Sequence, residues 1–110
     1  MGFKFNFKTM KNITFDSVDA FVENRNFKKQ NMEVSNGKLF LHGNKIAEKS
    51  NGKLFITCAG WATNTTKERL NEVLRRYKLG YIYQKNWTWY FVSSKDNSTI
   101  EFPNAGLTFN

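Results

Sequence analysis

Phenylalanine occupies every second position near the start of the chain, with Lys or Asn between successive rings. This period of two predicts a β-strand over residues 3–8 with one apolar face and one basic face. The apolar spacing then changes to i, i+3 and i+4 at Val18, Phe21 and Val22, behind a turn that contains acidic residues. That spacing predicts a short helix over residues 16–24.

A tight-turn motif recurs in the middle of the chain, where Asn-Gly-Lys-Leu-Phe stands at residues 36–40 and again at residues 51–55. Asn-Gly supplies the two positive φ angles of a type I′ turn, so each copy predicts a hairpin. Gly43 with Asn44 predicts a third turn, and the polar residues 25–30 predict a loop ahead of the first hairpin. The predicted strands of this meander are residues 33–35, 38–42, 45–49 and 53–58.

A longer helical pattern follows the meander. Its apolar stripe has the spacing i, i+3, i+4 and i+7 and consists of Leu70, Val73, Leu74 and Tyr77. Thr65 and Glu68 form a capping-box pattern, in which the Thr65 hydroxyl accepts from the Glu68 amide, and Gly80 is placed to end the helix. We therefore expect a helix over residues 65–79, with Trp61 ahead of it as an anchor against the sheet.

Aromatic residues dominate the segment after this helix. Residues 81–85 and 88–92 predict the two strands of a hairpin, with Asn86 and Trp87 in its turn. Residues 99–102 predict a further strand at the edge of the sheet.

The fold class follows from these elements. With 110 residues and 40% hydrophobic content, the chain has the size of one domain with one core. We predict a single α+β domain over residues 1–110. In it, antiparallel β-hairpins pack with one amphipathic helix at about residues 65–79 and a short N-terminal helix at about residues 16–24.

The net charge of the chain indicates which kinds of molecule it binds. The chain has 17 Lys and Arg against 9 Asp and Glu, which gives a formal charge of +8 and a pI near 9.8. A charge of this size attracts polyanions, so DNA or RNA is the expected partner. The competing interpretation is that Lys and Asn follow the composition of an AT-rich genome and that the charge serves solubility alone.

Candidate chemistry is sparse. The single cysteine, Cys58, and the single histidine, His42, are expected to be packing residues rather than a catalytic pair. No spacing matches a zinc site or a phosphate-binding glycine loop, so we expect no catalytic residue, no metal and no cofactor. The longest apolar stretch, residues 54–62, is too short to cross a bilayer, and the N-terminus lacks a signal-peptide pattern. We therefore expect a non-enzymatic, cytoplasmic protein.

The basic residues of the longer helix are the first candidate site. They lie outside the apolar stripe and are Lys67, Arg69, Arg75, Arg76 and Lys78. Cations on an exposed helix face are able to neutralise phosphates of a nucleic acid. Glu68 and Glu72 lie among them, so a solvated face of mixed charge is the competing interpretation.

The aromatic hairpin is the second candidate site. Tyr81 and Tyr83 share one face of their strand, Lys85 lies at its end, and alternation places Trp87 and Trp89 on one face of the next strand. Aromatic and basic side chains together are typical of surfaces that bind single strands. Because one face of the hairpin must belong to the core, only part of this set reaches solvent, and we expect Trp87 to be exposed.

Three segments resemble a group of small bacteriophage proteins. They are Leu-His-Gly-Asn-Lys-Ile-Ala at residues 41–47, Gly-Trp-Ala-Thr-Asn-Thr-Thr-Lys-Glu-Arg-Leu-Asn at residues 60–71, and Trp89 with Tyr90. The resemblance implies a phage origin and a location in the cytoplasm of the host bacterium. It implies no catalytic or binding residues, and residues 1–30 lie outside it.

Taken together, these patterns predict a phage accessory protein that binds nucleic acid through the basic helix and the adjacent hairpin surface. The alternative is an inhibitor or adaptor of a host defence or transcription protein, with Trp87 and the arginines as interface anchors. A small nuclease, the third class, requires a metal-binding carboxylate cluster that the sequence does not contain.

Overall fold

Short hairpins set the order of the elements in the structure, a computed structural model that describes residues 12–110. The strand predicted for residues 3–8 lies outside this range. In chain order the elements are α2 (Asn12–Val22), β1 (Phe27–Lys29), β2 (Met32–Ser35), β3 (Lys38–Leu41), β4 (Asn44–Ser50), β5 (Lys53–Ile56), α3 (Asn64–Arg76), β6 (Gly80–Lys85), β7 (Thr88–Ser93), β8 (Thr99–Glu101) and β9 (Leu107–Phe109). They confirm the predicted single α+β domain.

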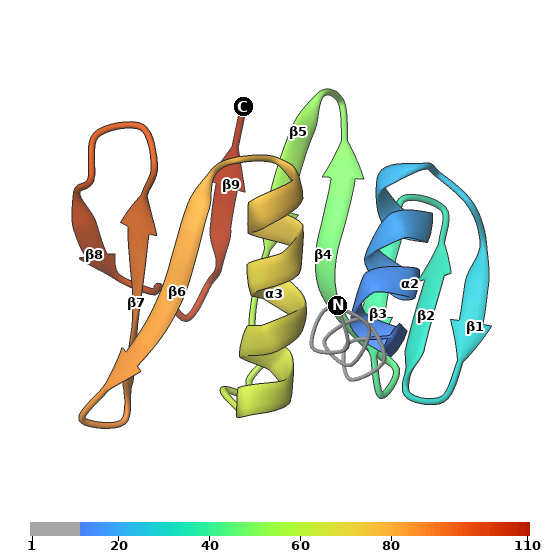
Figure 1. Ribbon diagram of the computed structural model, residues 1–110, viewed down its shortest axis with the longest axis horizontal. Coiled ribbons are helices and arrows are strands. Elements are labelled where there is room, and N and C mark those ends of the chain that lie inside the picture. Colours follow the sequence, from blue (N-terminus) through green and yellow to red (C-terminus); the bar gives the residue numbers. More distant parts are fainter. Residues whose placement is uncertain (1–11) are drawn as a thin grey trace, which may run out of the picture.

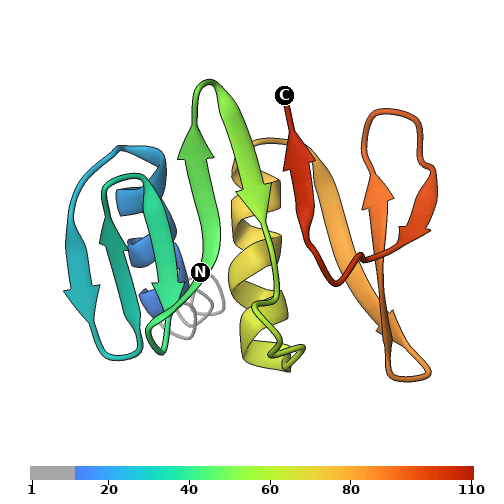
Figure 2. The same ribbon diagram turned by 180° about the vertical axis from the view of Figure 1, so that it is seen from behind.

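Two antiparallel sheets carry the fold. One has six strands in the order β1-β2-β3-β4-β5-β9, and the other has three in the order β6-β7-β8. The two helices of the described residues lie on the same face of the six-stranded sheet, with α2 over β1, β2 and β3 and with α3 between β4 and β6 (Figure 1). None of the described helices covers the other face (Figure 2), as an antiparallel sheet permits.

The Asn-Gly pairs form type I′ turns, as predicted. The φ angles are 52° and 74° at residues 36–37 and 53° and 75° at residues 51–52. The third turn lies one residue earlier than predicted, because the two positive angles belong to His42 and Gly43, at 52° and 79°. This position places glycine second in the turn, where the type I′ geometry requires it, and Asn44 then opens β4.

The N-terminal part departs from prediction at two places. Helix α2 begins at Asn12 rather than at residue 16, because its buried stripe includes Thr14 and Ser17, polar residues that a count of apolar positions omits. Residues 25–30 are not only a loop, since they contain the short, Lys-rich edge strand β1. The C-terminal strand β9, which pairs with β5, is also absent from the predicted elements.

Helix α3 confirms the predicted apolar stripe but not the predicted cap. Thr63 rather than Thr65 is the N-cap, and its Oγ1 accepts from the Thr66 amide at 3.2 Å. The earlier start brings Thr66 into the buried stripe, one turn before Leu70. The start of the helix is therefore determined by the burial of Thr66 as well as by the capping residue.

The end of α3 is closed by Lys78 rather than by Gly80. Lys78 has a φ of 56°, and the amides of Lys78 and Leu79 donate to carbonyls of the last turn at 3.1 and 3.0 Å, which is a Schellman motif. Gly80 is instead the first residue of β6, where a Cβ atom would lie 2.0 Å from the Val92 carbonyl oxygen. Its missing side chain thus permits the close pairing of β6 with β7.

The core lies between the helices and the inner face of the six-stranded sheet. Its fully buried side chains include Phe21, Leu39, Ile56, Leu70 and Leu74. The small sheet turns its inner face to the same core, because Phe91 packs edge-on against Phe109 and Trp89 packs against Phe102, each with ring centroids 5.5 Å apart. The outer face of the small sheet is left to solvent.

Candidate nucleic-acid interface

Two of the predicted arginines are held by carboxylates of the domain itself. Arg75 donates to Glu72 through Nε and Nη2, at 3.0 and 2.6 Å, and Arg76 Nε donates to the same carboxylate at 2.8 Å. Arg76 also pairs with Asp19 of α2. The hydrogen bonds to Glu72 raise the pKa of Arg75. Burial opposes the charge of Arg76, but its bonds to Asp19 and Glu72 outweigh burial and raise its pKa. These two charges are therefore largely neutralised within the fold.

Arg69 is buried, which contradicts its prediction as a surface residue. Only 5% of it is exposed. Its Nη1 donates to Thr14 Oγ1 at 2.6 Å, its Nη2 donates to Asn31 Oδ1 at 3.4 Å, and its Nε lies 3.3 Å from Met32 Sδ. Burial lowers the pKa of Arg69, and the nearby charge of Glu68 partly offsets this effect. The guanidinium joins α3 to α2 and to the β1–β2 turn and does not reach the surface.

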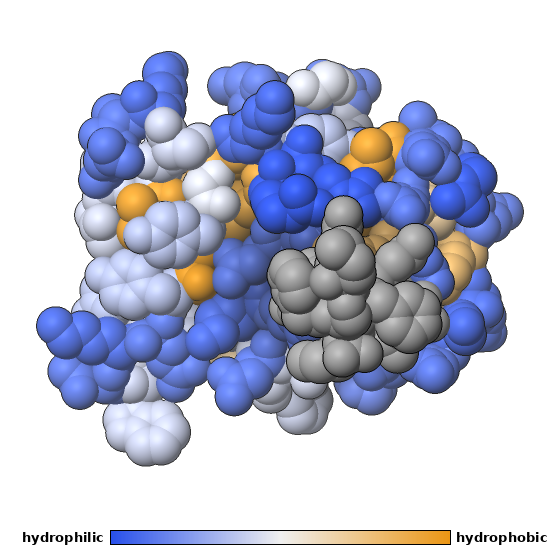
Figure 3. All heavy atoms as spheres, viewed as in Figure 1, coloured by the Kyte–Doolittle hydropathy of each residue, from blue (hydrophilic) through white to orange (hydrophobic). Residues whose placement is uncertain are grey.

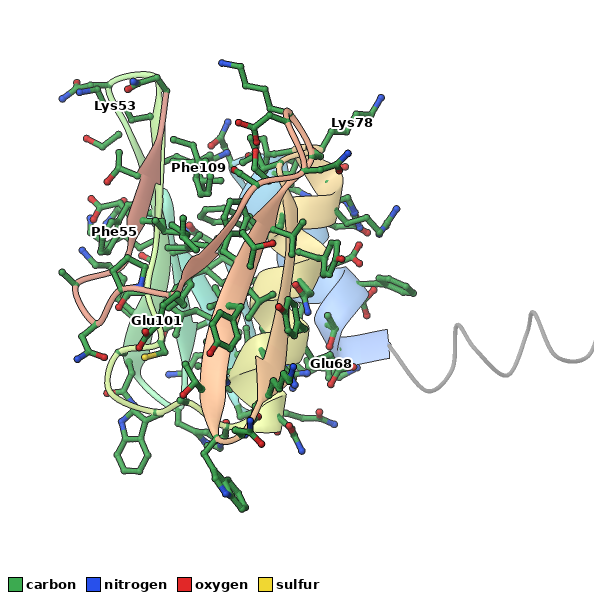
Figure 4. The ribbon with its side chains drawn as sticks, turned by 90° about the vertical axis from the view of Figure 1, so that its left-hand side faces the viewer. Lys53, Phe55, Glu68, Lys78, Glu101 and Phe109 are labelled. Carbon is green, nitrogen blue, oxygen red and sulfur yellow. The ribbon has the colours of Figure 1, made fainter. Side chains whose placement is uncertain are left out.

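The predicted lysines lie at or near the surface, as does Arg75, whose side chain is 64% exposed although it is paired with Glu72. Lys78 and Lys85 are exposed and Lys67 is half-buried. Lys78 lies at one end of the small sheet, where its carbonyl accepts from Ser94 Oγ at 2.7 Å, and Figure 4 shows its side chain there. Lys85 is the last residue of β6 and therefore lies at the opposite end of the sheet.

The position of Lys67 follows from the contact of α3 with β6. The Asn71 side chain bonds both backbone groups of Ile82, at 3.0 and 2.7 Å, and so pairs with the edge of β6. The helix and the strand run in opposite directions (Figure 1). Four helical residues rise about 6 Å, and two strand residues rise about 6.6 Å. Lys67, one turn before Asn71, therefore lies at the same end of the sheet as Lys85.

A row of tyrosines covers the outer face of the small sheet. Tyr81 and Tyr83 are 53% and 36% exposed, and Tyr90 of β7 lies opposite Tyr83 in the register. The rings of Tyr83 and Tyr90 stack with centroids 5.4 Å apart, and those of Tyr81 and Tyr83 are 6.4 Å apart. Pale and hydrophobic side chains gather over β6 and β7, with hydrophilic side chains above and below them (Figure 3). We call Tyr81, Tyr83, Tyr90, Lys85 and Trp87 the aromatic platform.

Trp87 forms the tip of the platform and is 93% exposed, which confirms the prediction. It lies in a type I′ turn with a φ of 69°, at the position that glycine occupies in the turns at residues 36–37, 42–43 and 51–52. A bulky side chain in the left-handed region costs about 1 kcal/mol. Trp89, predicted to share its face, is 5% exposed, because Trp87 belongs to the turn and Trp89 to the strand.

Trp61 does not anchor the helix, contrary to prediction, since it is 59% exposed. It forms a wall of a cavity of about 520 Å³ that His42 and Cys58 also line. Cys58 is buried, as predicted, whereas His42 is exposed in the β3–β4 turn and is not a packing residue. No motif indicated this cavity, because its walls come from separate segments that only the fold brings together.

The described residues also bear on metal binding and membrane insertion. Within residues 12–110, no group of three or more His, Cys, Asp or Glu side chains is arranged to hold a metal ion. No helix in that part of the chain has the length and apolar composition needed to cross a membrane.

The origin of the chain follows from its similarity to known proteins. No curated protein and no solved structure matches it. Residues 10–110 match the Kyanoviridae Gp96 protein family. The match confirms the resemblance to small phage proteins, and it also includes residues 10–30, which the resemblance left out. The chain therefore belongs to the Kyanoviridae Gp96 family of cyanophage proteins.

Proposed function

We propose that this phage protein is a non-enzymatic protein of the host cytoplasm that binds single-stranded nucleic acid on the aromatic platform. The supporting observation is the row of exposed rings that ends in Trp87, a bulky residue at a turn position suited to glycine. Strain of this kind is typically retained where a side chain has a function. Stacking of a base on an aromatic ring contributes about 1–3 kcal/mol and tolerates any sequence.

Lysines at the ends of the platform suit the phosphates of such a strand. Lys67 and Lys85 lie at one end and Lys78 at the other. Glu101 of β8 lies opposite Tyr90 and makes the far edge of the sheet acidic (Figure 4). We infer that the strand runs along β6, between the lysines, rather than across the sheet toward β8. A duplex stacks its bases internally, so this surface favours a single strand.

Fluorescence anisotropy with labelled single-stranded DNA, single-stranded RNA and duplex DNA at low salt tests the proposal. We expect the single strands to bind more tightly than the duplex, and Tyr83→Ala and Trp87→Gly to weaken their binding about tenfold each. Trp87→Gly should also raise the free energy of unfolding by about 1 kcal/mol, because it relieves the strained turn. Lost binding in that variant therefore cannot be attributed to unfolding.

Charge is tested by a matched pair of variants. Lys85→Ala removes a cation of the platform, whereas Lys28→Ala removes an exposed cation of β1, at the other edge of the molecule. We expect weaker binding for the first and unchanged binding for the second. The proposal is wrong if the native protein binds no nucleic acid at low salt, or if all of these variants bind like the native chain.

The exposure of Trp87 also favours a second function, the binding of a host protein by an inhibitor or adaptor. Exposed tryptophan is enriched among the residues that dominate protein interfaces. Pull-down from host lysate, with and without nuclease, separates the two functions. A partner that is retained after nuclease treatment and lost with Trp87→Gly supports the adaptor.

A further inference from the structure

A second candidate site is the cavity of about 520 Å³ beside Trp61. The β3–β4 turn, the β5–α3 loop and the first turn of α3 line it, and it is open to solvent on one side. Its floor is formed by the buried apolar residues Leu41, Ile46 and Cys58. Small-molecule sites measure about 300–1,000 Å³, and a cavity of about 150 Å³ already holds a benzene ring. The space is therefore large enough for a bicyclic aromatic ligand.

Backbone hydrogen bonds of the loop hold the backbone of Trp61 in place. The Trp61 amide donates to the Cys58 carbonyl at 2.8 Å, and the Trp61 carbonyl accepts from the Thr63 amide at 2.8 Å. Between them, Ala59 and Gly60 form a tight turn with φ angles of 55° and 82°. Because the backbone at Trp61 is held in place, a ligand that stacks on the indole has to order only its side-chain torsions and not the loop.

The rim of the cavity determines which ligand fits. Asn44 Nδ2 donates to the His42 carbonyl at 3.5 Å, a distance that holds the amide only weakly. An amide presents a donor beside an acceptor, the arrangement that pairs with the edge of a nucleobase. The described residues that line the cavity include no carboxylate, so a phosphate attached to the base meets no repulsion there. We propose that this cavity binds one nucleobase, stacked on Trp61 with Asn44 at its edge.

The base has two potential sources, a free nucleotide or a strand held on the aromatic platform. A smaller cavity of about 160 Å³, lined by Cys58, Ala62 and Trp87 among others, lies on the other side of the loop. Trp61 and Trp87 therefore belong to the same end of the molecule, and a strand that passes Trp87 can continue to the larger cavity. This second source rests on the proposed function, whereas a free nucleotide does not require it.

Isothermal titration calorimetry with AMP, GMP, CMP, UMP and inorganic phosphate tests the first source. We expect saturable binding of nucleotides, with purines preferred, and none of phosphate alone. Trp61→Ala should weaken nucleotide binding about tenfold, because it removes the stacking surface. Asn44→Ala should change the preference among bases. Lys28→Ala, on β1 at the other edge of the molecule, is the control and should leave nucleotide binding unchanged, and the melting temperature of each variant checks that it is folded.

Anisotropy with a labelled single-stranded oligonucleotide tests the second source in the same variants. If a base enters the cavity only as part of a strand, Trp61→Ala lowers the affinity for the oligonucleotide and leaves the binding of free nucleotides unchanged. The inference is overturned if Trp61→Ala changes neither measurement, or if inorganic phosphate competes as well as AMP. Neither result contradicts binding on the aromatic platform if Trp87→Gly still lowers the affinity for the oligonucleotide. The two proposals can therefore be rejected independently.

Discussion

Arg69 and Arg75 show how two arginines of one helix acquire different roles. The Arg69 side chain is 6% exposed and the Arg75 side chain is 64% exposed. On the helix surface Arg69 lies between Thr66 and Val73, both fully buried, so its position faces the core although its charge does not suit a core. A buried guanidinium is tolerated only when its N–H groups find hydrogen-bond acceptors, and Thr14 and Asn31 provide them.

We predict that Arg69→Ala lowers the free energy of unfolding by about 2–4 kcal/mol, because it leaves a cavity and removes the hydrogen bonds of buried partners. Arg75→Ala, the matched control on the same helix, should cost less than about 1 kcal/mol, since most of the side chain is exposed. Chemical denaturation of the two variants measures both. Equal losses would show that Arg69 has no special part in the packing.

At the level of elements, Glu72 organises the C-terminal half of α3. It is 7% exposed, and it accepts hydrogen bonds from Arg75 and Arg76, while Arg76 continues to Asp19 of α2. The cluster therefore links the two helices that cover the sheet. Because Arg75 and Arg76 already have carboxylate partners, we expect the basic face of α3 to bind phosphates only weakly.

Glu72→Gln should lower the free energy of unfolding by about 1–3 kcal/mol, because the two arginines lose their charged acceptor. Glu23→Gln is the control, since Glu23 also pairs with an arginine but its side chain is 59% exposed. Thermal melts compare the stabilities, and anisotropy compares binding of a single strand. We expect Glu72→Gln to bind a single strand as tightly as the native protein does. A large gain in affinity would show that the arginines of α3 contact the nucleic acid once Glu72 no longer pairs with them.

On the scale of the whole molecule, the positive charges of residues 12–110 are not concentrated in one patch. Lysines lie on β1, at the β4–β5 turn, at the end of α3 and at the end of β6. Figure 4 shows Lys53 and Lys78 at one end of the domain, whereas Glu68 and Glu101 lie toward the other. Specific contacts should therefore involve a few lysines near the platform, and the remaining charge should act as a general attraction.

The salt dependence of binding separates these two contributions. For a single strand, the slope of log K against log salt is about −0.7 for each phosphate contacted. Contacts from Lys67, Lys78 and Lys85 predict a slope of about −2, whereas neutralisation by the entire net charge predicts about −6. A salt titration of oligonucleotide affinity measures the slope. A value near zero would rule out phosphate contacts on the platform.

Much of the local structure was predictable from the chain. The type I′ turns, the apolar stripe of α3 and the exposure of Trp87 depend on φ preferences and spacing within a few residues. Errors arose where burial extended past the apolar residues, as at Thr14 in α2 and Thr66 in α3. Strand β1 was missed because its sequence, Phe-Lys-Lys, is short and mostly polar, and β9 was missed because its partner β5 lies far earlier in the chain.

The candidate site, like the fold, was predictable from the sequence only in part. By itself, the sequence determined that cations and aromatic residues are abundant around α3 and the β6–β7 hairpin. Only the tertiary structure decided which of them reach solvent, because Arg69 and Arg76 find their partners Thr14 and Asp19 on another helix, far away in the sequence. The exposure of Trp61 beside its cavity was decided in the same manner, since no local spacing records which segments will pack around a side chain.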